Sequence, residues 1–202
     1  MAELELNTDP QSASEKFAWW ISQLMSPPFL SLTAILLQAW LIHSKAAWLW
    51  ALFYISAGIL LPMGFVLRQY RKGEISDIDL SHRRDRYRPM LMLLSCAGLA
   101  TAIMNRSGAP VELVKLVAIM WLLSLALLAV TLLWKISVHC ATCAGVCTLI
   151  LFVGDQAMTL IIAAPAMVWS RTKLRAHTLS QTITGSMLGA GIFYLTYKYI
   201  IQ

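Results

Sequence analysis

Seven apolar stretches, separated by polar breaks, limit most strongly what this chain can fold into. Inside a lipid bilayer every backbone polar group must be satisfied within the protein, which favours helices. A helix of about 20 apolar residues crosses the hydrocarbon core. We therefore expect an all-α, polytopic bundle of six to seven transmembrane helices. The stretches cover residues 28–43, 46–67, 90–105, 110–134, 138–154, 157–170 and 179–200.

The composition also indicates an integral membrane protein. Of the 202 residues, 58% are hydrophobic and 13% are charged, whereas soluble domains are about 25% charged. We expect one transmembrane domain, residues 28–202, after a polar N-terminal segment, residues 1–27. This segment lacks a basic region before an apolar run, so no cleaved signal peptide is expected. Its acidic residues are Glu3, Glu5, Asp9 and Glu15.

The charged breaks predict which end of the bundle carries the function. If each stretch crosses the membrane in turn, the connections 68–89, 135–139 and 170–178 lie on the side of the N-terminus. Twelve of the sixteen Lys and Arg residues then lie on this side, and the positive-inside rule makes it cytoplasmic. The net charge of +6 arises from these loops, so the expected partners are membrane lipids and not nucleic acid.

The same side holds residue types that suit phosphate chemistry. Ionisable residues at the edge of apolar stretches are costly and mark functional sites. Arg88 and Arg171 are suited to bidentate phosphate contacts, and His139 and His177 to nucleophilic and acid–base roles. His177 and Gln181 are four residues apart, so on an early-starting helix they share a face. The amide oxygen of Gln181 would then accept from a ring N–H and fix the tautomer.

The pattern Ser170-Arg171-x5-His177-x3-Gln181 resembles the third motif of the type-2 phosphatidic acid phosphatase family, Ser-Arg-x5-His-x3-Asp. Members of that family are helical, metal-independent phosphatases that act on lipid phosphates and isoprenyl diphosphates. The resemblance implies that His177 is the nucleophile and forms a phosphohistidine. It also implies that Arg171 and Ser170 hold the phosphate, and that no cofactor is needed.

Two further segments extend the resemblance to about residues 80–190. Ser137-Val138-His139 resembles the Ser-Gly-His of the second motif, and Arg88-Pro89 the end of the first, Lys-x6-Arg-Pro. By this resemblance His139 protonates the leaving group, while Ser137 and Arg88 hold the phosphate. The chain departs from the family in three places. Ser81 replaces the lysine of the first motif, Val138 the glycine of the second and Gln181 the aspartate of the third. Arg84 is a candidate substitute for the missing lysine.

Two other functions are compatible with the sequence. The departures from the family motifs allow a catalytically impaired protein that binds lipid phosphates. The run of Asp77, Asp79 and Asp85 before Arg88 resembles the aspartate-rich loop of intramembrane prenyltransferases, where aspartates hold Mg²⁺ on a prenyl diphosphate. Those enzymes have a second such loop, and here Asp155 is expected on the opposite side.

Small residues in two of the stretches predict close helix packing. Cys140, Cys143 and Cys147 share a helical face, which fits packing better than a metal or redox site, because no second ligand pair completes a tetrahedron. Gly185 and Gly189 form a small-xxx-small pair in the last stretch.

Overall fold

The computed structural model describes residues 12–80, 82–154 and 157–201. All regular structure in this part of the chain is helical, which confirms the expected all-α fold. The main helices are α1 (Ala13–Leu24), α2 (Pro27–Ile42), α3 (Lys45–Tyr54), α4 (Leu61–Arg71), α5 (Tyr87–Arg106), α6 (Val111–Leu133), α7 (Val138–Gly154), α8 (Ala157–Lys173) and α9 (Leu179–Thr196). A π-helical turn, Ile55–Leu60, joins α3 to α4; a 3₁₀ turn, Arg84–Arg86, precedes α5; and a π-helical turn, Tyr197–Ile201, extends α9.

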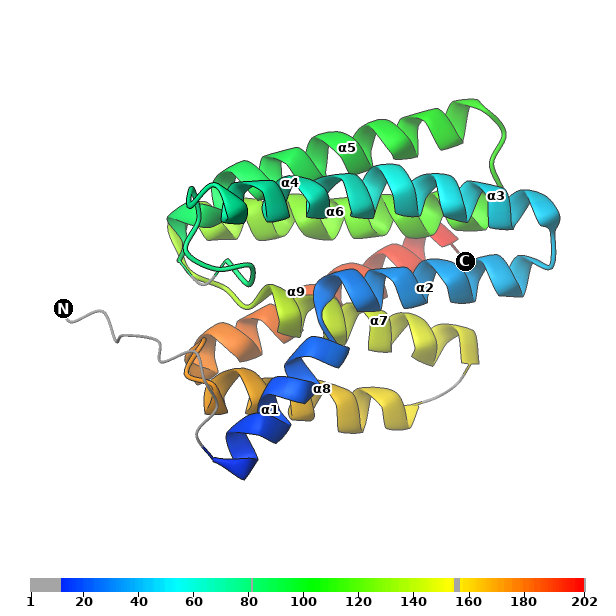
Figure 1. The fold of residues 1–202 in the computed structure, drawn as a ribbon. Helices are drawn as coiled ribbons and strands as arrows, with labels where there is room; N and C mark the ends of the chain where they lie inside the picture. Colours follow the sequence, from blue (N-terminus) through cyan, green and yellow to red (C-terminus); the bar gives the residue numbers. More distant parts are fainter. Residues whose placement is uncertain (1–11, 81, 155–156, 202) are drawn as a thin grey trace.

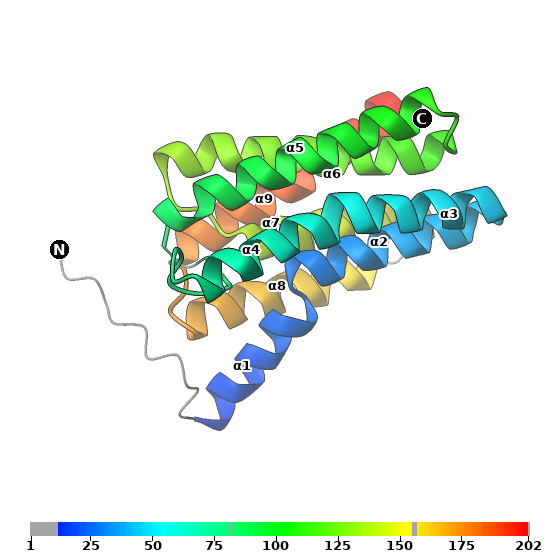
Figure 2. The ribbon, with the colours of Figure 1, turned by 45° about the horizontal axis from the view of Figure 1, so that its top comes forward.

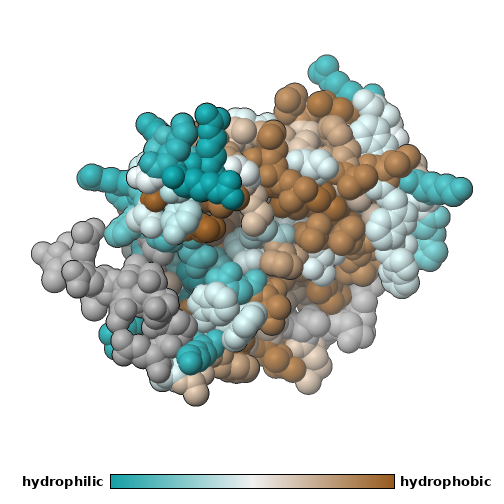
Figure 3. Space-filling model, viewed as in Figure 1, coloured by the Kyte–Doolittle hydropathy of each residue, from teal (hydrophilic) through white to brown (hydrophobic). Residues whose placement is uncertain are grey.

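The helices run back and forth along one common direction, so that their connections gather at two ends (Figure 1). The loop after α4, the loop between α6 and α7 and the loop between α8 and α9 meet at one end. This arrangement agrees with the expectation that the polar segments share one side. On the face shown in Figure 3, hydrophilic side chains gather at this end and hydrophobic side chains cover the middle.

Within the described part of the chain, three helices are long and apolar enough to cross a membrane: Lys45–Arg71, Arg84–Arg106 and Val111–Leu133. The helices α1 and α2, bent by 44° at the break between them, count as a fourth if they form one span. The structure thus has helices compatible with a membrane location. Helix α7 is apolar over Val138–Phe152, which is shorter than the length required of a full span.

Helix α1 lies inside the segment 1–27, for which the sequence predicted only a polar character. Its first turn is closed by a capping box, in which Ser12 Oγ accepts from the Glu15 backbone N–H and Glu15 Oε2 accepts from that of Ser12. It ends before Pro27 and Pro28, which suit the first turn of the next helix and not the interior of this one. Figure 2 shows α1 at an angle to α2 and beside α8. Residues 1–11, with Glu3, Glu5 and Asp9, lie outside the described part.

The closest helix contact joins α7 to α9 and confirms the predicted packing of the two glycines. A Cβ atom at Gly185 would lie 2.6 Å from the Ser137 carbonyl oxygen, and one at Gly189 would overlap the Ala141 carbonyl oxygen. Both glycines are buried. Only a residue without a side chain lets the two backbones approach this closely.

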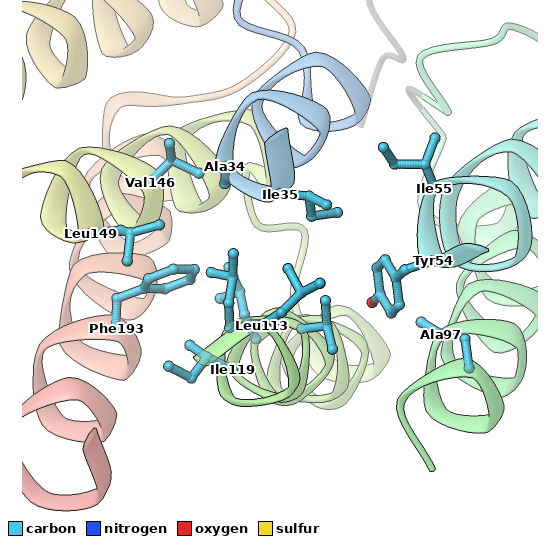
Figure 4. Close-up of a cluster of buried hydrophobic side chains, with 14 of the residues drawn as sticks. Ala34, Ile35, Tyr54, Ile55, Ala97, Leu113, Ile119, Val146, Leu149 and Phe193 are labelled. Atoms are coloured by element: carbon cyan, nitrogen blue, oxygen red, sulfur yellow. The ribbon is translucent and has the colours of Figure 1, made fainter. Parts of the chain in front are cut away.

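Apolar side chains from several helices fill the space beside this contact. Ile35 of α2, Leu113 of α6 and Phe193 of α9 belong to one buried cluster (Figure 4). Cys140, Cys143 and Cys147 of α7 are buried with Met167 of α8 in a second cluster. Among the described residues, no group of three or more His, Cys, Asp or Glu side chains is placed to hold a metal ion.

Replacing Gly189 with alanine should destabilise the protein, because the added methyl group would overlap the backbone of α7. Overpacking of this kind costs about 1–3 kcal/mol. Gly191, on the same helix, has no atom near its would-be Cβ, so Gly191→Ala should be neutral or slightly stabilising. Thermal unfolding in detergent measures both variants. Equal melting temperatures for Gly189→Ala and wild type would contradict the close contact.

Candidate active site

The His177 side chain is the centre of the polar group at the loop end of the bundle. It lies in the loop between α8 and α9 and is buried, and its backbone N–H donates to the Arg171 carbonyl oxygen at 3.3 Å. Its Nδ1 lies 3.0 Å from Gln181 Oε1. The same oxygen accepts from the Thr178 backbone N–H at 3.2 Å, within the capping box that begins α9. The helix cap thus fixes the group that holds the imidazole.

This geometry decides which ring nitrogen carries the proton. A backbone N–H only donates, so the side-chain atom of Gln181 that faces Thr178 must be the amide oxygen. That oxygen also only accepts, and His177 Nδ1 must therefore be the donor. The lone pair of the neutral ring is then on Nε2. The spacing of His177 and Gln181 predicted this contact, and the structure places it at Nδ1.

His139 lies in the first turn of α7 and is 7% exposed. Its Nε2 is buried and has no hydrogen-bond partner. The helix begins with Ser137 Oγ accepting from the Cys140 backbone N–H at 3.3 Å. The Ser137 backbone N–H donates to the Gln181 carbonyl oxygen at 3.3 Å. This bond ties the start of α7, with His139, to the start of α9, which holds His177.

Arg171 near the end of α8 is 2% exposed, so its guanidinium is removed from water. Nη1 donates to Ser22 Oγ of α1 at 2.7 Å and pairs with Asp79 Oδ2 at 3.3 Å. Nε is buried without a partner. The preceding Ser170 is also buried, and its hydroxyl donates to the Ala18 carbonyl oxygen at 2.6 Å. Ser170 therefore anchors α1, and Arg171 retains an unused donor.

Arg86 also belongs to this group, although the sequence motifs do not include it. It is 3% exposed. Its Nε donates to the Leu80 carbonyl oxygen at 2.7 Å and its Nη1 to the Ile136 carbonyl oxygen at 2.8 Å. It thereby joins the loop after α4 to the loop before α7. Arg86, Met90 and Leu94 are spaced four residues apart and are all buried, so they form one buried stripe along the start of α5. Extending that buried stripe back by one turn would have identified it.

The two other arginines proposed for phosphate lie at the surface. Arg84 is exposed. Arg88 has a side chain that is 77% exposed, and its partner is Glu74 at 3.8 Å. The structure brings together His139, His177 and Arg171, with Gln181 and Ser137 beside them, but it does not bring Arg84 or Arg88 to the group. Ser81 lies outside the described residues.

The charges around His177 are predominantly positive. Burial, followed by the charges of Arg86 and Arg171, lowers the pKa of His177 from 6.5 to about 3, and Lys135 adds to the shift while the Gln181 hydrogen bond opposes it. Burial and the same two arginines lower the pKa of Lys135. Arg171 and Arg86 also lie near enough to His139 for their charges to act on it. The buried positive charges of the two arginines favour the binding of an anion, and they keep the His177 ring neutral at physiological pH.

The aspartates of the loop after α4 have partners within the protein. Asp79 pairs with Arg171, and Asp85 Oδ2 accepts from the backbone N–H and the hydroxyl of Ser76 at 3.0 and 2.9 Å. Asp77 accepts from the Ser76 hydroxyl at 3.1 Å. These carboxylates thus order the loop and balance the arginines. Asp155 lies outside the described residues.

The His177 ring should stay neutral between pH 8 and pH 5. The unfolded chain takes up this proton near 6.5 and the folded chain only near 3. The stability that depends on the neutral ring is therefore complete above pH 6.5 and is lost as the pH falls toward 3. NMR of ¹⁵N-histidine-labelled protein, with His177→Gln to assign the signal, should show a proton on Nδ1 and none on Nε2. A titration near pH 6.5 would show that the ring is not buried beside the arginines.

The site thus combines two buried histidines with two buried arginines at one end of the bundle. Comparison of the chain with protein-family models, with curated proteins and with solved structures found no match.

Proposed function

We propose that this chain is a polytopic membrane phosphatase that hydrolyses a lipid phosphate or an isoprenyl diphosphate without a metal ion. The observation that carries the proposal is that His139 Nε2 and Arg171 Nε, two of the four buried polar side-chain atoms without partners among the described residues, both belong to the candidate site. An unsatisfied buried polar group costs about 1–3 kcal/mol. Oxygens of a phosphate would satisfy both atoms, and the positive surroundings favour an anion.

The proposed reaction uses the unprotonated Nε2 of His177 as the nucleophile. It forms a bond to phosphorus while the bond between phosphorus and the lipid oxygen breaks. His139 takes up the proton that the bound phosphate monoanion brings, and as the imidazolium it gives that proton to the leaving oxygen. Arg171 and Arg86 stabilise the charge on the transferring group. Water then attacks the phosphohistidine with His139 as the base, the P–N bond breaks, and phosphate leaves. Gln181 keeps the Nδ1 proton in place throughout.

The proposal includes the orientation of the chain in the membrane. Six to seven of the helices would cross the bilayer, with the lipid tail between them and the head group at the loop end. The positively charged loops at that end support a cytoplasmic location. Phosphatidate and prenyl diphosphates both fit this chemistry, because each presents a phosphoryl group at the end of an apolar tail.

A binding protein without turnover is the second candidate, and the contact of Gln181 with His177 is the observation that favours it. An amide orients the ring but does not stabilise an imidazolium by charge, as the aspartate of the resembling motif would. In that case the same group binds a lipid phosphate and holds it. The third candidate, a Mg²⁺-dependent prenyltransferase, would use the loop aspartates.

Phosphate release from lipid phosphates and prenyl diphosphates, by purified protein in excess chelator, tests the proposal. We expect turnover by the wild type and a loss of at least about 10³-fold in His177→Ala, because removal of a nucleophile abolishes the covalent route. His82→Ala, in an exposed loop position, is the matched control and should retain activity. Binding without release would favour the binding protein, and activity that requires Mg²⁺ would favour the transferase.

Asp79→Asn should tighten phosphate binding. The Asp79 carboxylate accepts from Arg171 at 3.3 Å and is partly exposed, so its charge opposes a phosphate held by the same guanidinium. Partly exposed charges interact by about 0.2–1 kcal/mol, which corresponds to at most about a fivefold change in affinity. Asp85→Asn is the control, because the Asp85 carboxylate accepts from Ser76 and not from Arg171. Inhibition constants for tungstate measure the effect, and weaker inhibition of Asp79→Asn would show that Asp79 positions Arg171 instead.

A further inference from the structure

Helix α1 has three distinct flanks. Ala18 and Ser22, four residues apart, are fully buried against the protein. Phe17, Trp20 and Leu24, at the spacing of one helical face, are 62%, 57% and 66% exposed. The remaining outer flank is polar except for Trp19.

The polar flank of α1 lies between the apolar flank and the bundle. By helical spacing it contains Lys16, Trp19 and Gln23, in line with the N-cap residue Ser12. Ser12, Lys16 and Trp19 are exposed and Gln23 is half-buried. A helix with an exposed apolar flank beside an exposed polar one is typical of a segment that lies along a membrane surface. A helix in water alone would gain nothing from exposing three large apolar side chains.

The aromatic residues of α1 also favour the membrane interface. The Trp19 and Trp20 rings contact each other edge to face at 5.0 Å, and the Phe17 ring lies 6.0 Å from that of Trp169 at the end of α8. Tryptophan is enriched where the bilayer meets water. The helix lies near the end of α8 that leads into the candidate site (Figure 1), and it departs from the direction of α2 by 44°.

The buried flank of α1 contacts the two residues that begin the histidine motif. Ser170 Oγ donates to the Ala18 carbonyl oxygen at 2.6 Å, and Arg171 Nη1 donates to Ser22 Oγ at 2.7 Å. Helix α1 is thus joined on one side to the arginine of the site, while its opposite side is free to meet lipid.

We propose that α1 lies in the interface of the membrane with Phe17, Trp20 and Leu24 among the lipid chains, and that this docking holds Ser22 against Arg171. The partner is the lipid surface on the same side as the candidate site. The position of α1 does not depend on the reaction, whereas its effect on anion binding rests on the proposed function of Arg171.

Spin labels on full-length protein in phosphatidylcholine vesicles test the position of α1. Trp20→Cys and Leu24→Cys place labels on the apolar flank and Lys16→Cys on the polar flank, in a Cys96→Ser background because the other cysteines are buried. We expect labels at 20 and 24 to collide with oxygen more than with a water-soluble nickel chelate, and the reverse at 16. Equal access of the chelate to all three positions would overturn the proposal.

Binding of tungstate, a tetrahedral anion, tests the coupling to Arg171. Trp20→Asp should weaken tungstate binding about tenfold, as should Ser22→Ala, because each loosens a hydrogen bond to a charged group. Lys16→Asp, on the polar flank, should leave it unchanged. If spin labels show that α1 has left the lipid in Trp20→Asp, and this protein still binds tungstate with wild-type affinity, the coupling is overturned. Absence of tungstate binding by the wild type would instead contradict the proposed function and leave the labelling result to stand by itself.

Discussion

The burial of the Arg171 guanidinium is the constraint on which the polar end of the structure depends. A buried charge is costly unless it is paired and hydrogen-bonded. Its partners come from two distant segments, Ser22 on α1 and Asp79 in the loop after α4. The arginine therefore holds α1 and this loop to the end of α8, and its Nε is buried without a protein partner.

The glycine contact between α7 and α9 places the two histidines relative to this arginine. Because Gly185 lies against the Ser137 carbonyl oxygen, the start of α7 is held beside the start of α9. The hydrogen bond from the Ser137 backbone to that of Gln181 forms at this point. Helix packing in the apolar part of the molecule thus fixes His139 at one helix start and His177 just before the other.

The sequence predicted most of the architecture, because apolar length and polar breaks report directly on helices and loops. Each expected stretch corresponds to helical structure, and the contact between His177 and Gln181 follows from their spacing of four residues. Helix α1 was missed because its apolar residues are interrupted by polar ones, so hydropathy alone does not separate it from the polar segment. Arg86 was not predicted because the Arg-Pro motif falls on Arg88, two positions later, and a charged residue among exposed arginines gives no local sign of burial. Contacts such as that of Arg171 with Ser22 join residues far apart in the chain, and no local pattern encodes them.

The central claim is that Nε2 of His177 attacks phosphorus, and a trapped covalent intermediate tests it most directly. Wild-type protein mixed with ³²P-labelled lipid phosphate and quenched rapidly in base should carry a label that is stable in base and lost in acid. Mass spectrometry should place the label on the peptide containing His177, and the His177→Ala protein should carry none of it, because it lacks the nucleophile. Turnover with no such label, or a label on another residue, would contradict the account.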